Sequence, residues 1–176
     1  MTARARPLPA SDHLRYREVR ADDRDALHAI LADDHVREYL LDGALPTREW
    51  VADEIAASER LFAARGVGLF VARLDGPGDA GDVGFCGFRT YDEIEPHPHL
   101  LYGLLPRATG RGLATEMARA LVEHATRVGF GPLRASVDEV NAASMRVLEK
   151  VGFRRYATLP GAFGPMHLLE LAADKG

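Results

Sequence analysis

Residues 101–125 read LYGLLPRATGRGLATEMARALVEHA, an apolar strand followed by a glycine-containing turn and an amphipathic helix. The strand ends at Pro106, which has no N–H to give to a sheet ladder. Gly110 and Gly112 permit backbone angles that let successive N–H groups of the turn point into one concavity. The helix that begins near Leu113 adds unpaired N–H groups and the positive end of its dipole. The segment therefore predicts a phosphate-binding turn at the start of a helix.

Backbone donors and two cationic side chains are the groups that this turn offers to an anion. Arg107 and Arg111 add positive charge beside the concavity. A surface turn that only joins a strand to a helix is the alternative interpretation of the same residues. The predicted phosphate-binding residues are Arg107, Thr109, Gly110, Arg111, Gly112, Leu113, Ala114 and Thr115.

The pattern Arg107-x-x-Gly110-x-Gly112 resembles the acyl-coenzyme A binding motif of the GNAT superfamily of N-acetyltransferases, Gln/Arg-x-x-Gly-x-Gly/Ala. The spacing differs from that of a P-loop, because no Gly-Lys-Ser/Thr follows. It differs equally from the Gly-x-Gly-x-x-Gly of dinucleotide-binding folds. The resemblance implies that the turn binds the phosphates of coenzyme A.

Residues 141–153, NAASMRVLEKVGF, resemble a second GNAT signature, Asn-x-x-Ser-x-x-Val-Leu-Glu-Lys-x-Gly-Phe. Asn141 suits a helix N-cap, Lys150 suits the negative C-terminal end, and Gly152 suits the left-handed residue that ends a helix. The resemblance implies that Asn141 contacts the pantetheine arm and that Ser144 lies close to the thioester sulfur. Lys150 is included with them among the cofactor-binding candidates.

A particular branch of the superfamily is indicated at positions 144 and 148. Many members carry a Tyr where this chain has Leu148, and that Tyr is assigned as the acid that protonates the departing thiolate. Ser144 with Val-Leu-Glu-Lys after it is similar to the ribosomal-protein N-terminal acetyltransferases and their small-molecule relatives, in which the Ser is the candidate proton donor. The resemblance also implies that backbone N–H groups around Leu104 and Leu105 bind the pantetheine arm and the oxyanion.

The resemblance spans roughly residues 14–171 and implies the GNAT fold, an α/β architecture with a mixed, mostly antiparallel central sheet flanked by helices. Apolar periodicity and turn composition predict the same elements. The expected strands are 14–19, 67–74, 82–91, 100–105, 133–137, 153–159 and 165–172, and the expected helices are 22–31, 47–64, one from 113 and one from 141.

Residues 92–99, DEIEPHPH, precede the motif strand and contain the candidates for the general base. The ribosomal branch commonly has Glu at the position that aligns with His99, so this chain departs from that pattern. An unperturbed imidazole titrates near about pH 6.5, which suits a base at neutral pH. Glu95 is the alternative base, directly or through water, and a solvated loop is the alternative interpretation of the stretch. His97 and His99 also suggest a metal site, but no third ligand is indicated, so no metal is expected.

Composition indicates one domain. The chain has 176 residues, 47% hydrophobic, which suits a domain over 14–176 preceded by a flexible arm over 1–13.

The net charge of -4 argues against nucleic-acid binding and is compatible with a cationic amine partner. Cys86 is the only cysteine, which excludes an internal disulfide. Without an apolar run of about eighteen residues or a signal peptide, we expect no membrane association and a cytoplasmic protein, monomeric or homodimeric.

These features predict an enzyme that moves an acetyl group from acetyl-CoA to a primary amine by direct transfer, with Ser144, His99 and Glu95 as catalytic candidates. A protein N-terminal α-amine is the first acceptor hypothesis, because deprotonating it costs about 3 kcal/mol less than deprotonating lysine. A small amine (an antibiotic, a polyamine or an amino acid derivative) and a non-catalytic coenzyme A binding module are the alternatives. Candidate acceptor-lining residues are Asp33, Asp34, Tyr39, Leu40 and Trp50, and Tyr102 is expected to be packed or substrate-lining.

Overall fold

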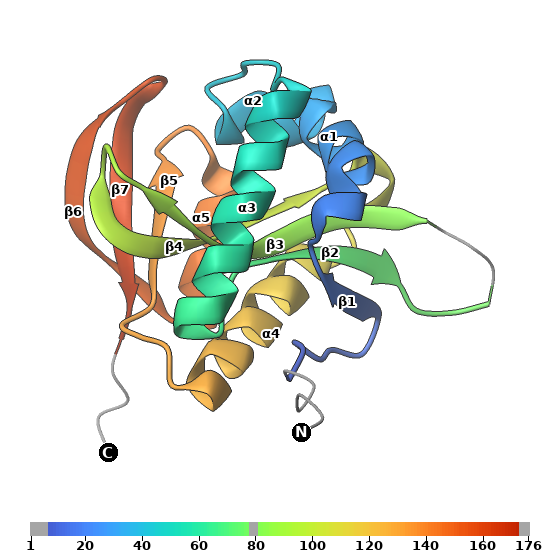
Figure 1. Cartoon of the computed structure of the whole chain (residues 1–176). Helices are drawn as coiled ribbons and strands as arrows, with labels where there is room; N and C mark the ends of the chain where they lie inside the picture. Colours follow the sequence, from blue (N-terminus) through green and yellow to red (C-terminus); the bar gives the residue numbers. More distant parts are fainter. Residues whose placement is uncertain (1–6, 78–80, 173–176) are drawn as a thin grey trace.

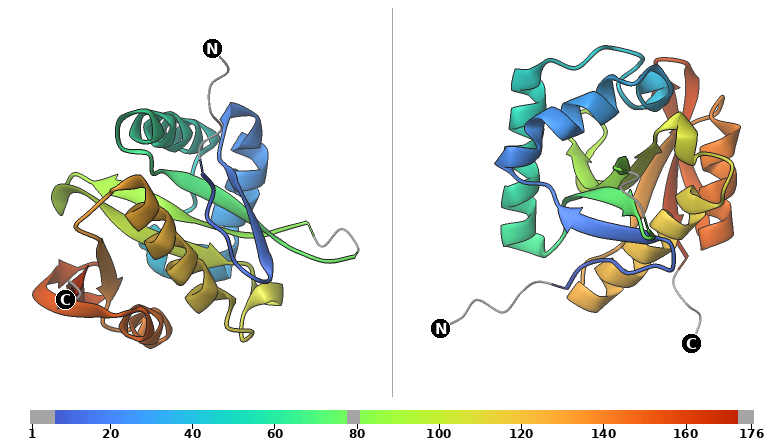
Figure 2. Two further views of the ribbon diagram at one scale, coloured as in Figure 1. Left: turned by 90° about the horizontal axis from the view of Figure 1, so that it is seen from below. Right: turned by 90° about the vertical axis from the view of Figure 1, so that its right-hand side faces the viewer.

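The computed structural model describes residues 7–77 and 81–172, which form a seven-stranded sheet between two layers of helices (Figures 1 and 2). The strand order is β1-β2-β3-β4-β5-β7-β6, and every neighbouring pair is antiparallel except β4 with β5. The predicted mixed, mostly antiparallel sheet is therefore confirmed. The strands are β1 (Leu14–Glu18), β2 (Leu69–Leu74), β3 (Asp82–Tyr91), β4 (Glu95–Leu104), β5 (Arg134–Asp138), β6 (Phe153–Gly161) and β7 (Gly164–Leu171).

Helices cover both faces of this sheet. A group of helices lies on each face, as the view from below shows most clearly (Figure 2). Short 3-10 turns at Ala21–Asp23 and Pro106–Ala108 lead into α1 and toward α4. The first face carries α1 (Arg24–Ala32), α2 (Asp34–Leu40) and α3 (Arg48–Arg65), and the second carries α4 (Leu113–Val128) and α5 (Ala142–Val151).

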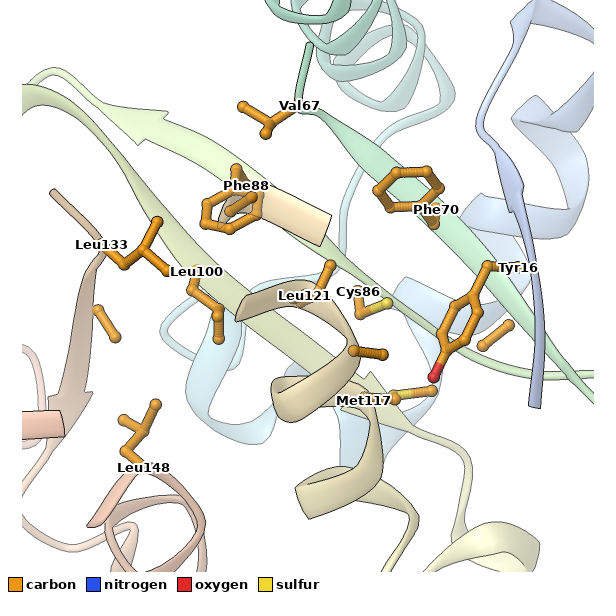
Figure 3. Packing of buried hydrophobic residues seen from close by; sticks show 14 of the residues in the cluster. Tyr16, Val67, Phe70, Cys86, Phe88, Leu100, Met117, Leu121, Leu133 and Leu148 are labelled. Atoms are coloured by element: carbon orange, nitrogen blue, oxygen red, sulfur yellow. The ribbon is translucent and has the colours of Figure 1, made fainter. Parts of the chain in front are cut away.

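Successive side chains of β4 point to opposite faces of the sheet, so the strand contributes to two hydrophobic cores. Leu100 packs with Phe88, Met117 and Leu121 on the α4 side (Figure 3), whereas Leu101 packs with the residues of α1 to α3. Each fully buried side chain of this size contributes about 1.5–3 kcal/mol to stability. The central strand is thereby held from both sides, which leaves its C-terminal half as a rigid wall for a site.

The helix ends follow the capping chemistry expected from the sequence. The Thr47 hydroxyl accepts a hydrogen bond from the Trp50 N–H at 3.1 Å, and the Asn141 side chain accepts one from the Ser144 N–H at 3.1 Å. Gly152 ends α5 in the left-handed conformation, with φ of 106°. Each N-cap is worth about 1 kcal/mol. The start of α5 is therefore set by Asn141, which places Ser144 on the first helical turn.

Two elements differ from the sequence-based expectation. The helix α2 was not predicted, because its seven residues are too few to show a clear period; Asp33 caps it by accepting from the backbone N–H groups of His35 and Val36. β4 begins at Glu95 rather than at residue 100, so the predicted strand was too short, and the alternative interpretation of this stretch as a solvated loop was wrong for residues 95–99. Its two prolines lie in a register irregularity, where a missing N–H removes no regular ladder bond.

The expected N-terminal arm is described from residue 7 onward, and that part contacts α4. Arg127 donates a hydrogen bond to the Leu8 carbonyl at 3.2 Å. The His13 N–H donates to Glu116 at 2.8 Å, and the His13 ring bonds the same carboxylate. Residues 1–6 lie outside the described residues. Over the described ranges, no helix is both long and apolar enough to cross a membrane.

Candidate functional site

The site begins where the parallel strands β4 and β5 separate. Their register contains a single pair, His99 with Arg134, although β4 continues to Leu104 and β5 to Asp138. Beyond that pair the two strands line opposite sides of a cleft of about 1010 Å³. The parallel pairing thus opens the sheet at the position where the predicted phosphate-binding turn follows β4.

The cleft joins most of the predicted cofactor-binding residues. Both motif segments reach it, although they are separated by α4 and β5 in the chain. Four predicted cofactor-binding residues do not line it, namely Leu105, Arg107, Arg111 and Lys150, and neither do the base candidates Glu95 and His99. The predicted residues on its wall are Leu104, Thr109, Gly110, Gly112, Leu113, Ala114, Thr115, Asn141 and Ser144.

The turn before α4 has the geometry of an anion cradle. Gly110 and Gly112 have φ of 72° and 76°, and a Cβ at either position would meet no atom within 4 Å. The space beside them is therefore open for a ligand. Gly112 is the N-cap of α4, so the N–H groups of the first helical turn point out of the helix toward that space. Backbone donors and the helix dipole together suit a phosphate.

The predicted cationic side chains are placed elsewhere. Arg107 donates to the Asp82 carbonyl at the start of β3. Arg111 and Lys150 are exposed, and neither is among the residues that line the cleft. The structure thus attributes the anion-binding geometry to the backbone of the turn more than to these three side chains.

The two leucines expected to offer backbone donors differ from one another. The Leu105 N–H donates to the Val83 carbonyl at 2.8 Å, so it is already used within the sheet. Because successive N–H groups of a strand point to opposite sides, the Leu104 and Tyr102 N–H groups point away from β3, toward the split. The Leu104 N–H is therefore oriented to bind a ligand in the split, whereas the Leu105 N–H is not.

Tyr102 and Ser144 meet across the cleft. The Tyr102 hydroxyl lies 2.8 Å from Ser144 Oγ and donates weakly to the Ser144 carbonyl at 3.3 Å. Burial raises the pKa of Tyr102 to about 12, although its hydrogen bond with Ser144 opposes the rise. The phenol is therefore neutral at physiological pH and carries a proton to donate.

The base candidates lie together at the closed end of the split. His99 is 1% exposed, and its Nε2 lies 2.6 Å from Glu95 Oε1. Burial lowers the pKa of His99, and the Glu95 carboxylate opposes this without reversing it. Although partial burial raises the pKa of Glu95, hydrogen bonds from His99 and Tyr156 and the charge of Arg134 lower it overall. Neither residue lines the cleft, so their catalytic roles stay predictions.

The cleft has a second arm, away from the glycine turn before α4, which extends over α2 and the loop that follows α2. Of the predicted acceptor-lining residues, Tyr39, Leu40 and Trp50 line it. Asp33 instead caps α2, and Asp34 forms an ion pair with Arg37 at 2.5 Å.

Three carboxylates in this arm were not predicted from the sequence. Asp42, Glu93 and Asp138 line the cleft. Burial raises the pKa of Asp138, and the nearby charge of Asp42 raises it further. The sequence offered one weak signal, and only for Asp138, which ends the strand immediately before the second motif. The three carboxylates contribute negative charge to the lining of the cleft.

Arg89 lines the cleft and contacts α3. Its guanidinium forms two hydrogen bonds with Glu54, at 2.6 and 3.0 Å, and lies over the rings of Trp50 and Tyr91. The charge of this cleft-lining arginine is thereby balanced by Glu54.

The histidines of the base region do not assemble a metal site. His97 Nε2 lies 2.6 Å from the Pro132 carbonyl oxygen, and its ring stacks on Phe130. Among residues 7–77 and 81–172, no group of three or more His, Cys, Asp or Glu side chains is arranged to hold a metal ion.

Known proteins share both the sequence pattern and the fold. A family model for the acetyltransferase (GNAT) domain matches residues 13–154, which include both motifs. The uncharacterized protein YkkB of Bacillus subtilis is 31% identical over 155 residues, covering 85% of this chain and 86% of YkkB.

Solved structures agree on the fold. A protein of Bordetella pertussis described as a GNAT-family acetyltransferase has a TM-score of 0.79 at 22% identity, covering 95% of this chain and all of that one. RimL, a ribosomal L7/L12 α-N-protein acetyltransferase solved with coenzyme A, has a TM-score of 0.74 at 17% sequence identity, covering 93% of this chain and 96% of the RimL chain. AAC(6′)-Ib, solved with paromomycin and acetyl-CoA, has a TM-score of 0.69 at 24% sequence identity, covering 90% of this chain and 93% of the AAC(6′)-Ib chain. With the family match over most of its length, the chain belongs to the GNAT acetyltransferase family.

Proposed function

We propose that this protein transfers the acetyl group of acetyl-CoA directly to a primary amine. The observation that carries the proposal is the continuous cleft, which joins the anion cradle at Gly110 and Gly112 to Ser144 and then to the arm over α2. A cofactor arm and an amine entering from opposite ends would meet near Ser144. Orienting two reactants in this way accounts for much of the rate of an acyl transfer.

The cradle fits the phosphates of coenzyme A. Its two glycines leave open space, and the N–H groups of residues 113–115 supply donors at the positive end of α4. The Leu104 N–H and Asn141 are the proposed partners of the pantetheine arm. Acetyl-CoA would supply the activated thioester. Coenzyme A in the RimL and AAC(6′)-Ib crystals supports the same assignment.

Ser144 is the proposed proton donor to the thiolate. It lies on the first turn of α5, half-buried, with its backbone anchored by Asn141 and its hydroxyl at the cleft wall. Cys86 is completely buried in the core, where burial raises the pKa of its thiol. A buried neutral thiol does not serve as an acyl carrier, so the amine attacks the thioester directly.

The first acceptor candidate is a protein N-terminal α-amine. Neither His99 nor Glu95 lines the cleft, so a base would act through water or the amine would lose its proton before binding. An α-amine, with a pKa near about 8, meets this requirement at a lower free-energy cost than lysine. The RimL similarity supports the same class.

A cationic small molecule, such as an aminoglycoside or a polyamine, is the second candidate. Asp42, Glu93 and Asp138 line the acceptor arm, and carboxylates attract an acceptor that carries further ammonium groups. The AAC(6′)-Ib similarity supports this class.

A mixed acceptor panel tests the proposal. The protein is incubated with acetyl-CoA and with N-terminal Ala and Ser peptides, lysine peptides, polyamines and aminoglycosides, and products are detected by mass spectrometry. Gain of one acetyl group on the α-amine peptides alone supports the first candidate, and gain on the polycations alone supports the second. Acetyl-CoA binding with no acetylated product, at any amine, would support a non-catalytic binding module instead.

A further inference from the structure

Tyr102 connects the two walls of the cleft. It belongs to β4, whereas Ser144 belongs to α5, and the 2.8 Å contact between their hydroxyl oxygens crosses the cleft. The Tyr102 ring packs against the main hydrophobic core, so the position of its hydroxyl is set by β4. A rigid strand thus presents a phenol to the residue proposed as proton donor.

The helix α5 has no phenol of its own at the site. Leu148, one turn beyond Ser144, is 2% exposed and packs in the core (Figure 3). Ser144 therefore has no tyrosine neighbour on its own helix near the sulfur, and the phenol that contacts it comes from the opposite wall.

Hydrogen-bond roles follow from the number of protons available. The Ser144 N–H is bonded to Asn141. The Tyr102 hydroxyl lies 2.8 Å from Ser144 Oγ, where either oxygen can be the donor, and at the longer distance of 3.3 Å from the Ser144 carbonyl oxygen. When the phenol donates to Ser144 Oγ, the serine proton is free to point at a ligand atom in the cleft. Donation to Ser144 Oγ also polarises the serine hydroxyl and strengthens it as a donor.

We propose that Tyr102 is a positioning residue for acetyl transfer, donating to Ser144 Oγ so that the serine proton points at the sulfur of coenzyme A. The inference rests on the proposed function. The amine nitrogen forms a bond to the thioester carbonyl carbon and gives up one proton to water. As the carbon–sulfur bond breaks, its electron pair stays on sulfur and the Ser144 proton moves to the sulfur. Ser144 then recovers a proton from water, and Tyr102 keeps its own throughout.

The ionisation of bound coenzyme A tests this arrangement without any acceptor amine. The thiolate is followed by its ultraviolet absorbance between about pH 6 and pH 10 in the complex with coenzyme A. The Cys86 thiol does not interfere, because it is completely buried and burial raises its pKa. A hydrogen bond to a thiolate lowers the thiol pKa, so Tyr102→Phe should raise it by about one unit, and Ser144→Ala by at least as much.

A double-mutant comparison separates positioning from ordinary packing. With Ser144→Ala in place, adding Tyr102→Phe should change neither the thiol pKa nor kcat further, because Tyr102 acts through the serine. Tyr102→Phe alone should lower kcat about tenfold or more, with KM for acetyl-CoA unchanged. Independent effects of the two substitutions would overturn the proposal, as would an unchanged thiol pKa in Tyr102→Phe.

Tyr16→Phe is the matched control. Tyr16 belongs to β1 and does not line the cleft, and its hydroxyl lies 3.0 Å from Oγ of Ser11, which precedes that strand. Loss of this second tyrosine–serine contact should leave the thiol pKa of bound coenzyme A unchanged. Calorimetric titration of coenzyme A into the wild-type protein comes first: failure to bind overturns the proposed function, and this inference with it. Normal binding with an unchanged thiol pKa overturns the inference alone.

Discussion

His99 on β4 and Arg134 on β5 form the backbone pair at which the two parallel strands meet, and one carboxylate binds both side chains. Glu95 Oε1 lies 2.6 Å from His99 Nε2, and Glu95 Oε2 lies 2.5 Å from Arg134 Nη1. The network holds the strands together immediately before they separate. It therefore stabilises the closed end of the cleft, and its ionisation should affect the whole domain.

Acidification should destabilise the protein partly through His99. Burial lowers the pKa of His99 in the folded state, so the unfolded chain binds the proton more readily. The contribution is fully present above about pH 6.5 and is lost as the pH falls through the folded pKa. His99→Gln should make the unfolding free energy less pH-dependent between about pH 6.5 and pH 5, by up to about 1.4 kcal/mol per pH unit.

Urea unfolding at a series of pH values measures this slope. His124 is a useful companion, because it is also buried and burial lowers its pKa, while its Nε2 contacts the Gly66 carbonyl. His124→Gln should reduce the slope similarly, and the double variant should reduce it further. An identical slope for wild type and His99→Gln would contradict the prediction.

Gly112→Glu should abolish useful binding of coenzyme A. The new carboxylate would enter the open space of the cradle, beside the phosphates, at a backbone φ of 76° that favours glycine. Like-charge repulsion and lost donors should weaken the Kd at least about a hundredfold, or about 3 kcal/mol. Isothermal titration with coenzyme A measures the change.

Gly129→Glu is the control for the same substitution at the opposite end of α4. Gly129 has a φ of 74° and equally open surroundings, but it ends the helix far from the turn and does not line the cleft. The affinity of the Gly129→Glu variant for coenzyme A should match that of the wild type. Equal loss in both variants would mean that backbone strain, and not the cradle, explains the effect.

Arg89→Met should destabilise the domain by about 2–3 kcal/mol, because Glu54 would be left partly buried without its partner. The double variant Arg89→Met/Glu54→Leu should recover most of the loss. Chemical denaturation measures both. Arg48→Met, which breaks an exposed pair with Asp25, should cost less than about 1 kcal/mol. A double variant no more stable than Arg89→Met would count against the explanation.

Gly87→Ala should be among the most damaging single substitutions. A Cβ at this position would lie 2.1 Å from the Gly68 carbonyl oxygen, and the φ of 148° is unfavourable for alanine. Because backbone cannot move aside cheaply between β2 and β3, we expect a loss of about 3 kcal/mol or more. Gly43→Ala, with a φ of 74° and no neighbour within 4 Å, should lose about 1 kcal/mol by the same denaturation assay.

The sequence predicted most elements well because their signals are local. Thr47, Asn141 and Gly152 each act within a few residues of the helix end that they determine. The short helix α2 gave no such periodic signal, and β4 was shortened in the prediction because prolines usually end a strand. The irregular register that accommodates these prolines depends on the partner strand, which a linear pattern does not reveal.

The amino-acid sequence by itself determined the geometry of the glycine-containing turn before α4, since its strand end, glycines and helix start are contiguous and their backbone preferences are intrinsic. Only the tertiary structure decided which side chains share the cleft. Tyr102 and Ser144 are 42 positions apart, and they meet because β4 and β5 separate beyond His99. The tertiary structure also decided that His99 is buried and does not line the cleft, although Leu101 and Gly103 on the same face of β4 do, because burial depends on which elements cover each residue.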